Sequence, residues 1–386
     1  MKKFFTSFLL LVLAFSFLLT PSLHIAHAES GVELSSKSGL LMDYSSGEVL
    51  FEKDALVHLP VASMVKMMTI LIALEEFDEG NVNLDTMIST SENASGMGGS
   101  QVFIDPYVEY SFEDLLKSVI MASANDASVA LAEYFNGNEK SFVNRMNRRA
   151  KELGMNDTNY VNCTGLPAPE QYSCAKDSCL LMREILKHDL YHKYSSIWMD
   201  TLTHPSGRET ELVNTNKLIR YFQGCDGGKT GSTNEAGCCL TASAKRNDMR
   251  LISCIIGAEN SKTRFNEASL LLNYGFSNFE NKFLINKDVA LSVIPVSKGK
   301  VEEIELFANE NFTAVVKKGN DEKYETIFKL PDFVKAPMKA GDKVGSVMVT
   351  KDGNVVKEID VVLKQDVKHN SCLLYTSDAA DDLIGV

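Results

Sequence analysis

Three short segments carry side chains that could perform acyl transfer: Ser63-Met-Val-Lys66, Ser123-Ala-Asn125 and Lys229-Thr-Gly231. They supply a serine nucleophile with a lysine three residues later, a hydroxyl and amide pair, and a cationic strand edge. Such a set is what acyl transfer to a serine requires when no histidine takes part. Each segment alone is a weak signal, so the interpretation depends on all three occurring in this order.

The first segment combines a nucleophile with a base. Ser63 follows Pro60 and is expected in the first turn of a helix, so that Lys66 projects from the same face. A serine hydroxyl must lose its proton to a nearby group, and a buried lysine whose pKa is lowered by burial and by other cations can accept it. The S-x-x-K pattern also occurs at Ser173 and Ser297, but Ser63 alone begins the most apolar predicted helix.

The second segment is predicted to form a turn between two helices. There, the Ser123 hydroxyl could relay a proton to the leaving amine, and the Asn125 amide could donate to a peptide carbonyl of the substrate. The alternative is an ordinary N-cap for the helix that follows, because serine and asparagine are common at that position. The two roles are compatible.

The third segment is predicted to precede a strand. Lys229 provides positive charge for a substrate carboxylate and helps to lower the pKa of Lys66, while the hydroxyls of Thr230 and Ser232 can bind the same carboxylate. Gly231 has no side chain, so that a ligand backbone could lie along the strand edge. The alternative is a simple turn, because K-T-G is also a common turn tripeptide.

The same arrangement suggests where the developing negative charge would be held. The backbone N–H groups of Ser63 and Ser232 are expected to form an oxyanion hole.

The elements that must position these groups follow from the apolar patterning, which mixes strands and helices. Two hairpins are expected at 38–55 and 236–258, and helices at 63–77, 141–155 and 264–276. The apolar stretch 112–135 reads as two helices broken at Ser123. From about residue 281, helical periodicity gives way to short strands with glycine turns, which predicts a separate all-β domain.

These patterns define four predicted parts of the chain. Residues 1–28 have the basic start, apolar run and Ala26-His-Ala28 site of a signal peptide, with a retained membrane anchor as the alternative. The catalytic domain is expected at 29–279 and the β domain at 280–370. Residues 371–386 fit neither domain and are interpreted as an artefactual or unstructured tail.

Composition narrows the possible partners and cofactors. The formal charge is −12, which makes a nucleic-acid partner unfavourable, and 45% hydrophobic residues are enough for a sizeable core. The eight cysteines are expected to be mostly free thiols rather than a disulfide framework. They form no CxxC pair with matching histidines, so neither a metal site nor another cofactor is expected.

Taken together, the motifs and several longer stretches resemble the D-alanyl-D-alanine carboxypeptidases, the low-molecular-mass penicillin-binding proteins. The stretches are "DYSSGEVLFEKDA", "LPVASMVKMMT", "SANDASVALAE", "MNRRAKELGMNDTNYVNCTGL", "NTNKLI", "DGGKTGSTNEAG" and "VKAPMKAGDKVG". The resemblance covers most of residues 33 to 365. It implies a helix-flanked antiparallel sheet that carries the three motifs, followed by a small all-β domain, hence a mixed α/β (α+β) fold of the DD-peptidase type.

The resemblance also implies an activity and partners. Similar enzymes remove the terminal D-alanine from peptidoglycan pentapeptide stems outside the cytoplasm, in the periplasm or at the wall, and penicillins acylate their serine. Carried onto this chain, Ser63 is the nucleophile, Lys66 the base, and Ser123 and Asn125 assist. Lys229 orients the carboxylate with Thr230, Gly231 and Ser232, and Arg264 matches a family arginine that contacts it. For Arg264 the alternative is an ion pair with Glu267.

The chain departs from the family pattern at several places. Cysteines stand where relatives often carry small, hydroxylic or aromatic residues, and the amphipathic C-terminal anchor that attaches such proteins to the membrane is not recognisable. Gly228 stands where a larger apolar residue is common, which predicts a looser strand before Lys229.

Three alternative functions share these motifs. A class A β-lactamase needs a further glutamate with an asparagine four residues later, and Glu152 and Asn156 match this literally, although Gly154 favours a helix end there. A non-catalytic wall-binding scaffold is disfavoured by the intact motifs. Transpeptidation shares the acyl-enzyme, so the motifs do not distinguish it from hydrolysis.

Overall fold

The computed structural model describes residues 31–320 and 322–370 of the 386-residue chain. The predicted signal peptide and the predicted tail lie outside the described residues. Among the residues described, every helix is too short or too polar to span a bilayer.

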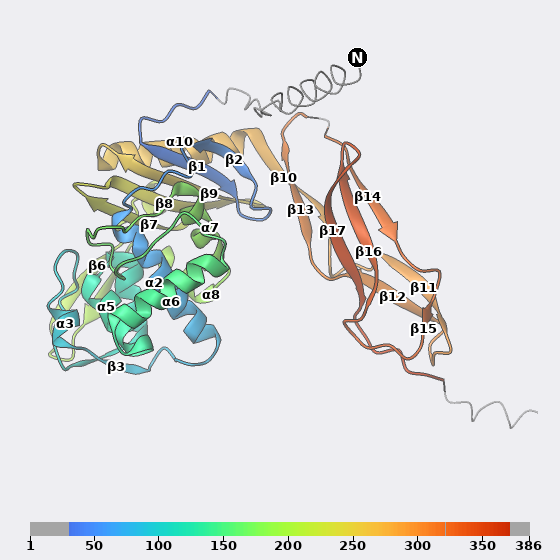
Figure 1. The fold of residues 1–386 in the computed structure, drawn as a ribbon, viewed down its shortest axis with the longest axis horizontal. Helices are drawn as coiled ribbons and strands as arrows, with labels where there is room; N and C mark the ends of the chain where they lie inside the picture. The colour runs from blue at the N-terminus through green and yellow to red at the C-terminus, as the bar shows by residue number, and fades with distance from the viewer. Residues whose placement is uncertain (1–30, 321, 371–386) are drawn as a thin grey trace, which may run out of the picture. The chain divides into compact units, whose positions relative to one another are not determined.

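A five-stranded antiparallel sheet, in the order β2-β1-β9-β8-β7, forms the centre of the first domain (Figure 1). Its strands are β1 (Ser38–Asp43), β2 (Val49–Lys53), β7 (Cys225–Thr233), β8 (Gly237–Arg246) and β9 (Met249–Ala258). Both predicted hairpins are confirmed, since β1 pairs with β2 and β8 with β9. Strand β7 lies at the edge of the sheet, so one side of its backbone is not paired within the sheet.

Helices cover both faces of this sheet, which explains why its central strands β1, β8 and β9 are buried at most positions. Helix α10 (Ser261–Asn278) packs on one face, and α7 (Ala175–Ile185) and α2 (Lys66–Asp78) lie on the other (Figure 1). The α10 contact is close: a Cβ atom at Gly275 would lie 2.4 Å from the Leu251 side chain. Helix α2 has the uniformly buried start that its apolar sequence predicts.

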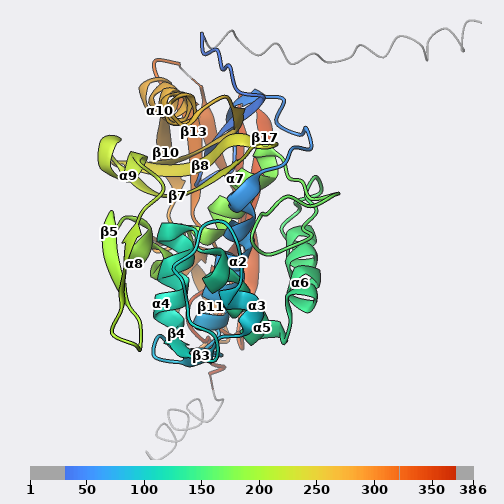
Figure 2. The same ribbon diagram turned by 90° about the vertical axis from the view of Figure 1, so that its left-hand side faces the viewer.

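The remaining elements of this domain surround α2 and the edge strand. They are η1 (Ala62–Val65), β3 (Met87–Ser89), α3 (Glu92–Ser95), β4 (Glu109–Ser111), α4 (Phe112–Lys117), η2 (Ser118–Ala122), α5 (Asn125–Asn136), α6 (Glu139–Glu152), α8 (Asp189–Ser195), β5 (Met199–Thr203), β6 (Glu209–Val213) and α9 (Leu218–Tyr221). Helices α8 and α9 contact β7 and lie beside it in Figure 2. The predicted break near Ser123 is confirmed, and Gly154, with φ of +74°, follows the end of α6.

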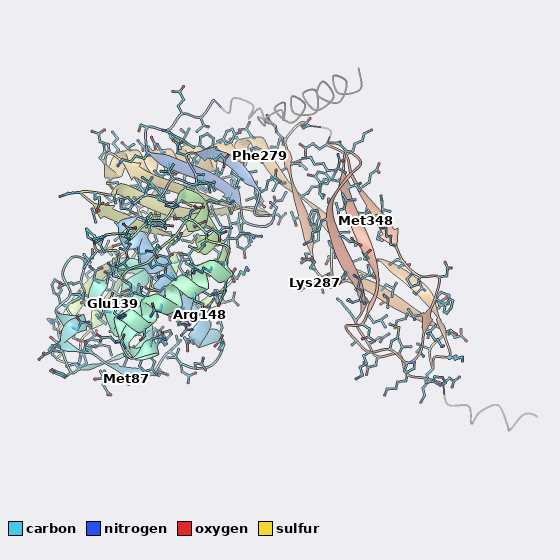
Figure 3. All side chains as sticks on the ribbon, viewed as in Figure 1. Met87, Glu139, Arg148, Phe279, Lys287 and Met348 are labelled. Carbon is cyan, nitrogen blue, oxygen red and sulfur yellow. The ribbon has the colours of Figure 1, made fainter. Side chains whose placement is uncertain are left out.

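The chain leaves α10 at Asn278 and enters an all-β region at Phe279 (Figure 3). Strands β10 (Phe279–Ile285) and β13 (Phe312–Lys317) form a pair. A six-stranded sheet contains, in spatial order, β14 (Tyr324–Lys329), β16 (Lys343–Lys351), β17 (Asn354–Leu363), β12 (Glu303–Ala308), β11 (Ser292–Ser297) and β15 (Val334–Lys335). Alternate residues such as Val347, Val349, Ile359 and Val361 form its separate core.

All seven cysteines in the described residues are free thiols. Five of them are buried in the first domain, namely Cys163, Cys174, Cys179, Cys239 and Cys254. They occupy the small apolar positions that their strand-like and helical surroundings require.

Candidate active site

Ser63 and Lys66 meet at the start of the most buried helix. Ser63 lies in the short 3₁₀ turn η1, and Lys66 is the first residue of α2. Lys66 Nζ lies 3.0 Å from Ser63 Oγ, while Ser63 itself remains partly exposed. The predicted juxtaposition of a hydroxyl and an amine is therefore present.

The environment of Lys66 favours its neutral form. The side chain is fully buried, and burial lowers the pKa of Lys66 to about 7 even though Asp126 and Cys163 act in the opposite direction. Nζ donates a hydrogen bond to the Thr164 carbonyl, which holds the amine in place. A neutral amine fixed in this way keeps a lone pair that can accept the Ser63 proton.

The turn that carries Ser63 is pressed between two glycines. Ala62 has φ of +49°, in the left-handed region. At Gly165 (φ of +82°) a Cβ atom would lie 2.0 Å from the Ala62 carbonyl oxygen, and at Gly231 a Cβ atom would lie 2.4 Å from the Val61 oxygen. Gly231 therefore makes room for the turn itself, in addition to the expected space for a ligand backbone.

Ser123 also occupies strained backbone. It follows the π-helical turn η2 and has φ of +61° and ψ of +34°. Lys229 Nζ donates to Ser123 Oγ at 2.7 Å. The N-cap of α5 is Ala124 and makes no side-chain capping bond, so the capping alternative is wrong. Strained residues of this kind are concentrated at functional sites.

Asn125 is the first residue of α5 and is almost fully buried. Its Nδ2 donates to the Gly98 carbonyl at 2.6 Å. Its Oδ1 is buried and has no hydrogen-bond partner among the described residues. The amide therefore ties the 98–100 loop to the site.

Lys229 lies inside β7 rather than before a strand, so that prediction is wrong. Its pairing with β8, including Lys229 opposite Thr241, continues the sheet through this glycine-rich sequence. Burial, and then the nearby charges of Lys66 and Arg264, lower the pKa of Lys229. Nζ also donates to the Thr230 carbonyl at 3.0 Å.

Strand β7 is not loosened at Gly228, contrary to prediction. The Gly228 N–H donates to the Tyr191 hydroxyl at 2.9 Å, and Asn216 Nδ2 donates to the Gly227 carbonyl. A Cβ atom at Gly228 would lie 2.6 Å from the Thr241 carbonyl oxygen. Close packing of the backbone at Gly228 therefore takes the place of the larger apolar side chain that is common at this position in the family.

Arg264 extends the site along the same strand. Its Nη1 donates to the Gly231 carbonyl at 3.1 Å and to Ser232 Oγ at 3.2 Å. The alternative ion pair does not form, because Glu267 instead accepts hydrogen bonds from Ser35 and Ser36. The guanidinium is thus held beside the exposed hydroxyl of Ser232.

These groups surround a cleft of about 500 Å³. Its lining includes six of the predicted residues: Ser63, Ser123, Thr230, Gly231, Ser232 and Arg264. Lys66, Asn125 and Lys229 are not part of the lining, and each contacts a residue or loop at the site from behind. The two lysines therefore contact the cleft through the hydroxyls of Ser63 and Ser123.

The β-lactamase alternative lacks its glutamate at this cleft. Glu152 ends α6, is 54% exposed and pairs with Arg149. It does not line the cleft, and neither does Asn156.

One group of potential metal ligands occurs among the described residues outside the cleft, formed by Asp157, Cys174 and Asp177. Its members have structural partners: the Cys174 sulfur accepts from the Asp177 N–H at the start of α7, and Asp177 accepts from Thr158. These contacts stabilise the beginning of the helix.

Comparison with known proteins identifies this arrangement. The family model for D-alanyl-D-alanine carboxypeptidase matches residues 24–260, and the model for the C-terminal domain of penicillin-binding protein 5 matches residues 279–369. The chain belongs to the D-alanyl-D-alanine carboxypeptidase family. The D-alanyl-D-alanine carboxypeptidase DacF of Bacillus subtilis is 40% identical over 336 residues, which cover 86% of this chain and 86% of the relative.

Two further relatives support the same assignment. DacC of Escherichia coli is 34% identical, with 92% of this chain and 90% of the relative covered. The crystal structure of penicillin-binding protein 5 from Haemophilus influenzae superimposes with a TM-score of 0.74 at 31% identity, over 87% of this chain and 98% of that structure. The predicted fold class and the serine-type carboxypeptidase function are confirmed.

Several residues of this carboxypeptidase site were not singled out from the sequence. Thr164 supplies the carbonyl that holds Lys66, Gly165 admits the Ser63 turn, and Thr215 Oγ1 accepts a hydrogen bond from Thr230 Oγ1 at 2.8 Å. All three lie in stretches that resemble the family, "NCTGL" and "NTNKLI". Their location in these stretches was the available indication of a role at the site, but only the fold shows which groups they contact.

Replacing Gly165 with alanine tests the role of the turn. Alanine at this positive φ costs about 1–2 kcal/mol, and the clash with the Ala62 carbonyl adds overpacking of about 1–3 kcal/mol. Gly165→Ala should therefore lower the melting temperature and displace Ser63, reducing labelling by a fluorescent penicillin. Gly137→Ala is the matched control, because Gly137 has φ of +76° and nothing within 4 Å of an added Cβ. Equal effects of the two changes would contradict the steric explanation.

Proposed function

We propose that Ser63 is the nucleophile and Lys66 the base of the carboxypeptidase reaction. The proposal is carried by the 3.0 Å separation of Lys66 Nζ and Ser63 Oγ, together with the pKa of about 7 for Lys66. As Ser63 Oγ attacks the carbonyl of the penultimate D-alanine, its proton passes to Lys66. The amide C–N bond then breaks, and an ester to Ser63 forms.

The leaving amine needs a proton, and we propose that Ser123 relays to it the proton that Lys66 took from Ser63. Ser123 lines the cleft, and its Oγ accepts a hydrogen bond from Lys229. A donor behind the hydroxyl makes the Ser123 proton easier to transfer toward the amine. Water then hydrolyses the ester and releases the shortened peptide. Asn125 assists by fixing the adjacent loop.

The terminal carboxylate of the substrate is proposed to bind at Thr230, Ser232 and Arg264. All three line the cleft, and Arg264 is their permanent cation. Lys229 is proposed to help orient this carboxylate through the Ser123 hydroxyl, to which its Nζ donates. The N–H groups of Ser63 and Ser232 are proposed as the oxyanion hole, and Gly231 gives a ligand backbone access to the edge strand.

The cellular setting is proposed on the same basis. The relatives are cell-envelope penicillin-binding proteins, whose family acts on D-Ala-D-Ala stems and binds penicillin. We infer export directed by residues 1–28, a catalytic domain at 29–279, a β domain at 280–370 and a tail at 371–386 that is not part of either. Attachment to the outer face of the cytoplasmic membrane through a C-terminal anchor is part of the same proposal.

Hydrolysis is proposed in preference to the alternatives. The exposed position of Glu152, outside the cleft, disfavours rapid β-lactam turnover, and the Ser63–Lys66 contact disfavours a non-catalytic scaffold. Transfer of the acyl group to a second stem's amine would use the same ester.

Incubation of a pentapeptide ending in D-Ala-D-Ala, followed by mass spectrometry, tests the function directly. We expect loss of one alanine, with no added mass when an amine acceptor is supplied. Ser63→Ala should abolish both this loss and covalent penicillin labelling. Ser173→Ala is the matched control, because Ser173 has the same S-x-x-K spacing but hydrogen-bonds to Thr158. A cross-linked product would favour transpeptidation, and no labelling of the unmutated protein would favour a scaffold.

The protonation state of Lys66 predicts a pH dependence. Since the lysine must be neutral to accept the proton, the rate of penicillin acylation should fall as the pH drops below about 7 and level off above it. Lys66→Arg, which stays protonated, should not be acylated at any of these pH values. Stopped-flow acylation measured across the neutral and alkaline ranges gives the profile. An inflection near the ordinary lysine value of 10.5 would contradict the proposed role.

Replacing Lys229 separates its catalytic role from its structural one. Lys229→Ala removes the donor to Ser123 and should lower kcat/KM for a D-Ala-D-Ala peptide about a hundredfold or more. Its melting temperature should stay within a few degrees of the unmutated protein. Lys245→Ala, at an exposed position of the neighbouring strand β8, is the control. Unchanged kinetics with a clearly lowered melting temperature would show that Lys229 is only structural.

A further inference from the structure

A second pocket of about 560 Å³ adjoins the catalytic cleft. It lies between α9 and the first half of α10, and its lining includes Lys217, Tyr221, Lys262 and Phe265. Lys217 lines both the cleft and this pocket. We call it the α9–α10 pocket.

Side-chain contacts connect the α9–α10 pocket to the carboxylate end of the cleft. Arg264, which lines the cleft, donates to Ser261 in the pocket at 3.1 Å and lies 4.7 Å from the ring centre of Phe265. Arg220 forms a second connection, since its guanidinium lies 5.6 Å from the Trp198 ring in the cleft and 6.0 Å from the Tyr221 ring in the pocket. The two cavities therefore share a wall.

The charges around the α9–α10 pocket are unusual for this acidic chain. Lys217, Arg220, Lys262 and Arg264 form no ion pair with a carboxylate in residues 31–320 or 322–370. The chain as a whole carries a formal charge of −12. With Arg264 assigned to the terminal carboxylate, three cations without a carboxylate partner among the described residues remain beside the pocket, and they favour an anionic ligand. Tyr221, which is 73% exposed, offers an aromatic face beside them.

We propose that the α9–α10 pocket binds an acidic side chain on the leaving residue of the substrate. The inference rests on the proposed function, because Arg264 must hold the carboxylate of that residue. A side chain on the same residue would start beside Arg264 and could extend past Ser261 toward Lys262. The pocket would then recognise a leaving residue that is larger than D-alanine and carries a second carboxylate.

The chemistry at Ser63 is unchanged by this extension. The same amide C–N bond breaks, the acyl group passes to Ser63 Oγ, and the leaving amine receives a proton through Ser123. Water hydrolyses the ester. Only the amine that departs is larger.

Three acetylated tripeptides that differ only in the leaving residue test the proposal. They end in D-Ala-D-2-aminoadipate, D-Ala-D-norleucine or D-Ala-D-lysine, which have side chains of similar length with a negative, neutral or positive end. We expect kcat/KM to be highest for the aminoadipate peptide, by about two- to fivefold over norleucine for an exposed ion pair. The preference should shrink at high salt, because the pairing is electrostatic.

Substitution of Lys262 assigns the preference to the pocket. Lys262 is exposed and does not line the cleft, so hydrolysis of a D-Ala-D-Ala peptide should not change. Lys262→Ala should remove most of the aminoadipate preference, and Lys262→Glu should reverse it in favour of the D-lysine peptide. Lys151→Ala, at an exposed position of α6, is the matched control and should retain the preference.

The possible outcomes separate this inference from the proposed function. Equal kcat/KM for the three peptides, or a preference that survives Lys262→Glu, would overturn the α9–α10 pocket as a subsite while leaving D-Ala-D-Ala hydrolysis intact. Loss of D-Ala-D-Ala hydrolysis in the unmutated protein would instead contradict the proposed function.

Discussion

The burial of two lysine amines without carboxylate partners is the constraint on which the site depends. Lys66 and Lys229 are nearly inaccessible, and among the described residues their Nζ atoms contact only hydroxyl and carbonyl oxygens. A carboxylate within contact distance would favour the charged form of each amine. The neutral hydroxyl and carbonyl oxygens accept hydrogen bonds from the two amines without favouring their charged forms in this way. The fold thereby keeps an amine at Ser63 able to take up a proton near neutral pH.

Close backbone packing holds the turn that carries Ser63 beside segments that are distant from it in the sequence. The turn that carries Ser63 fits between Gly165 and Gly231 only because both lack a Cβ. The left-handed conformations of Ala62 and Ser123 are held by the surrounding core, since such backbone is unfavourable for residues with side chains. The turn that carries Ser63 and the turn at Ser123 therefore both depend on packing against segments that are far away in the sequence.

The sequence predicted those features that depend on local pattern. The two hairpins, the apolar helix α2 and the break near Ser123 follow from periodicity and turn residues. The predictions failed where tertiary pairing overrides composition: Lys229 lies within a strand despite its glycine-rich surroundings, and Gly228 is tightly packed. The role of Thr164 could not be predicted, because every residue has a backbone carbonyl and residue type does not indicate which one accepts from Lys66.

The buried cysteines have a consequence for chemical durability. Burial raises the pKa of Cys174 and Cys239 to about 12, and it also raises the pKa of Cys163 and Cys179 well above the ordinary thiol value. The thiolate is the form that oxidants and disulfides attack, so these sulfur atoms are almost unreactive at neutral pH. A chain rich in cysteine can thus pass through oxidising surroundings with its core sulfurs intact, because folding itself protects them.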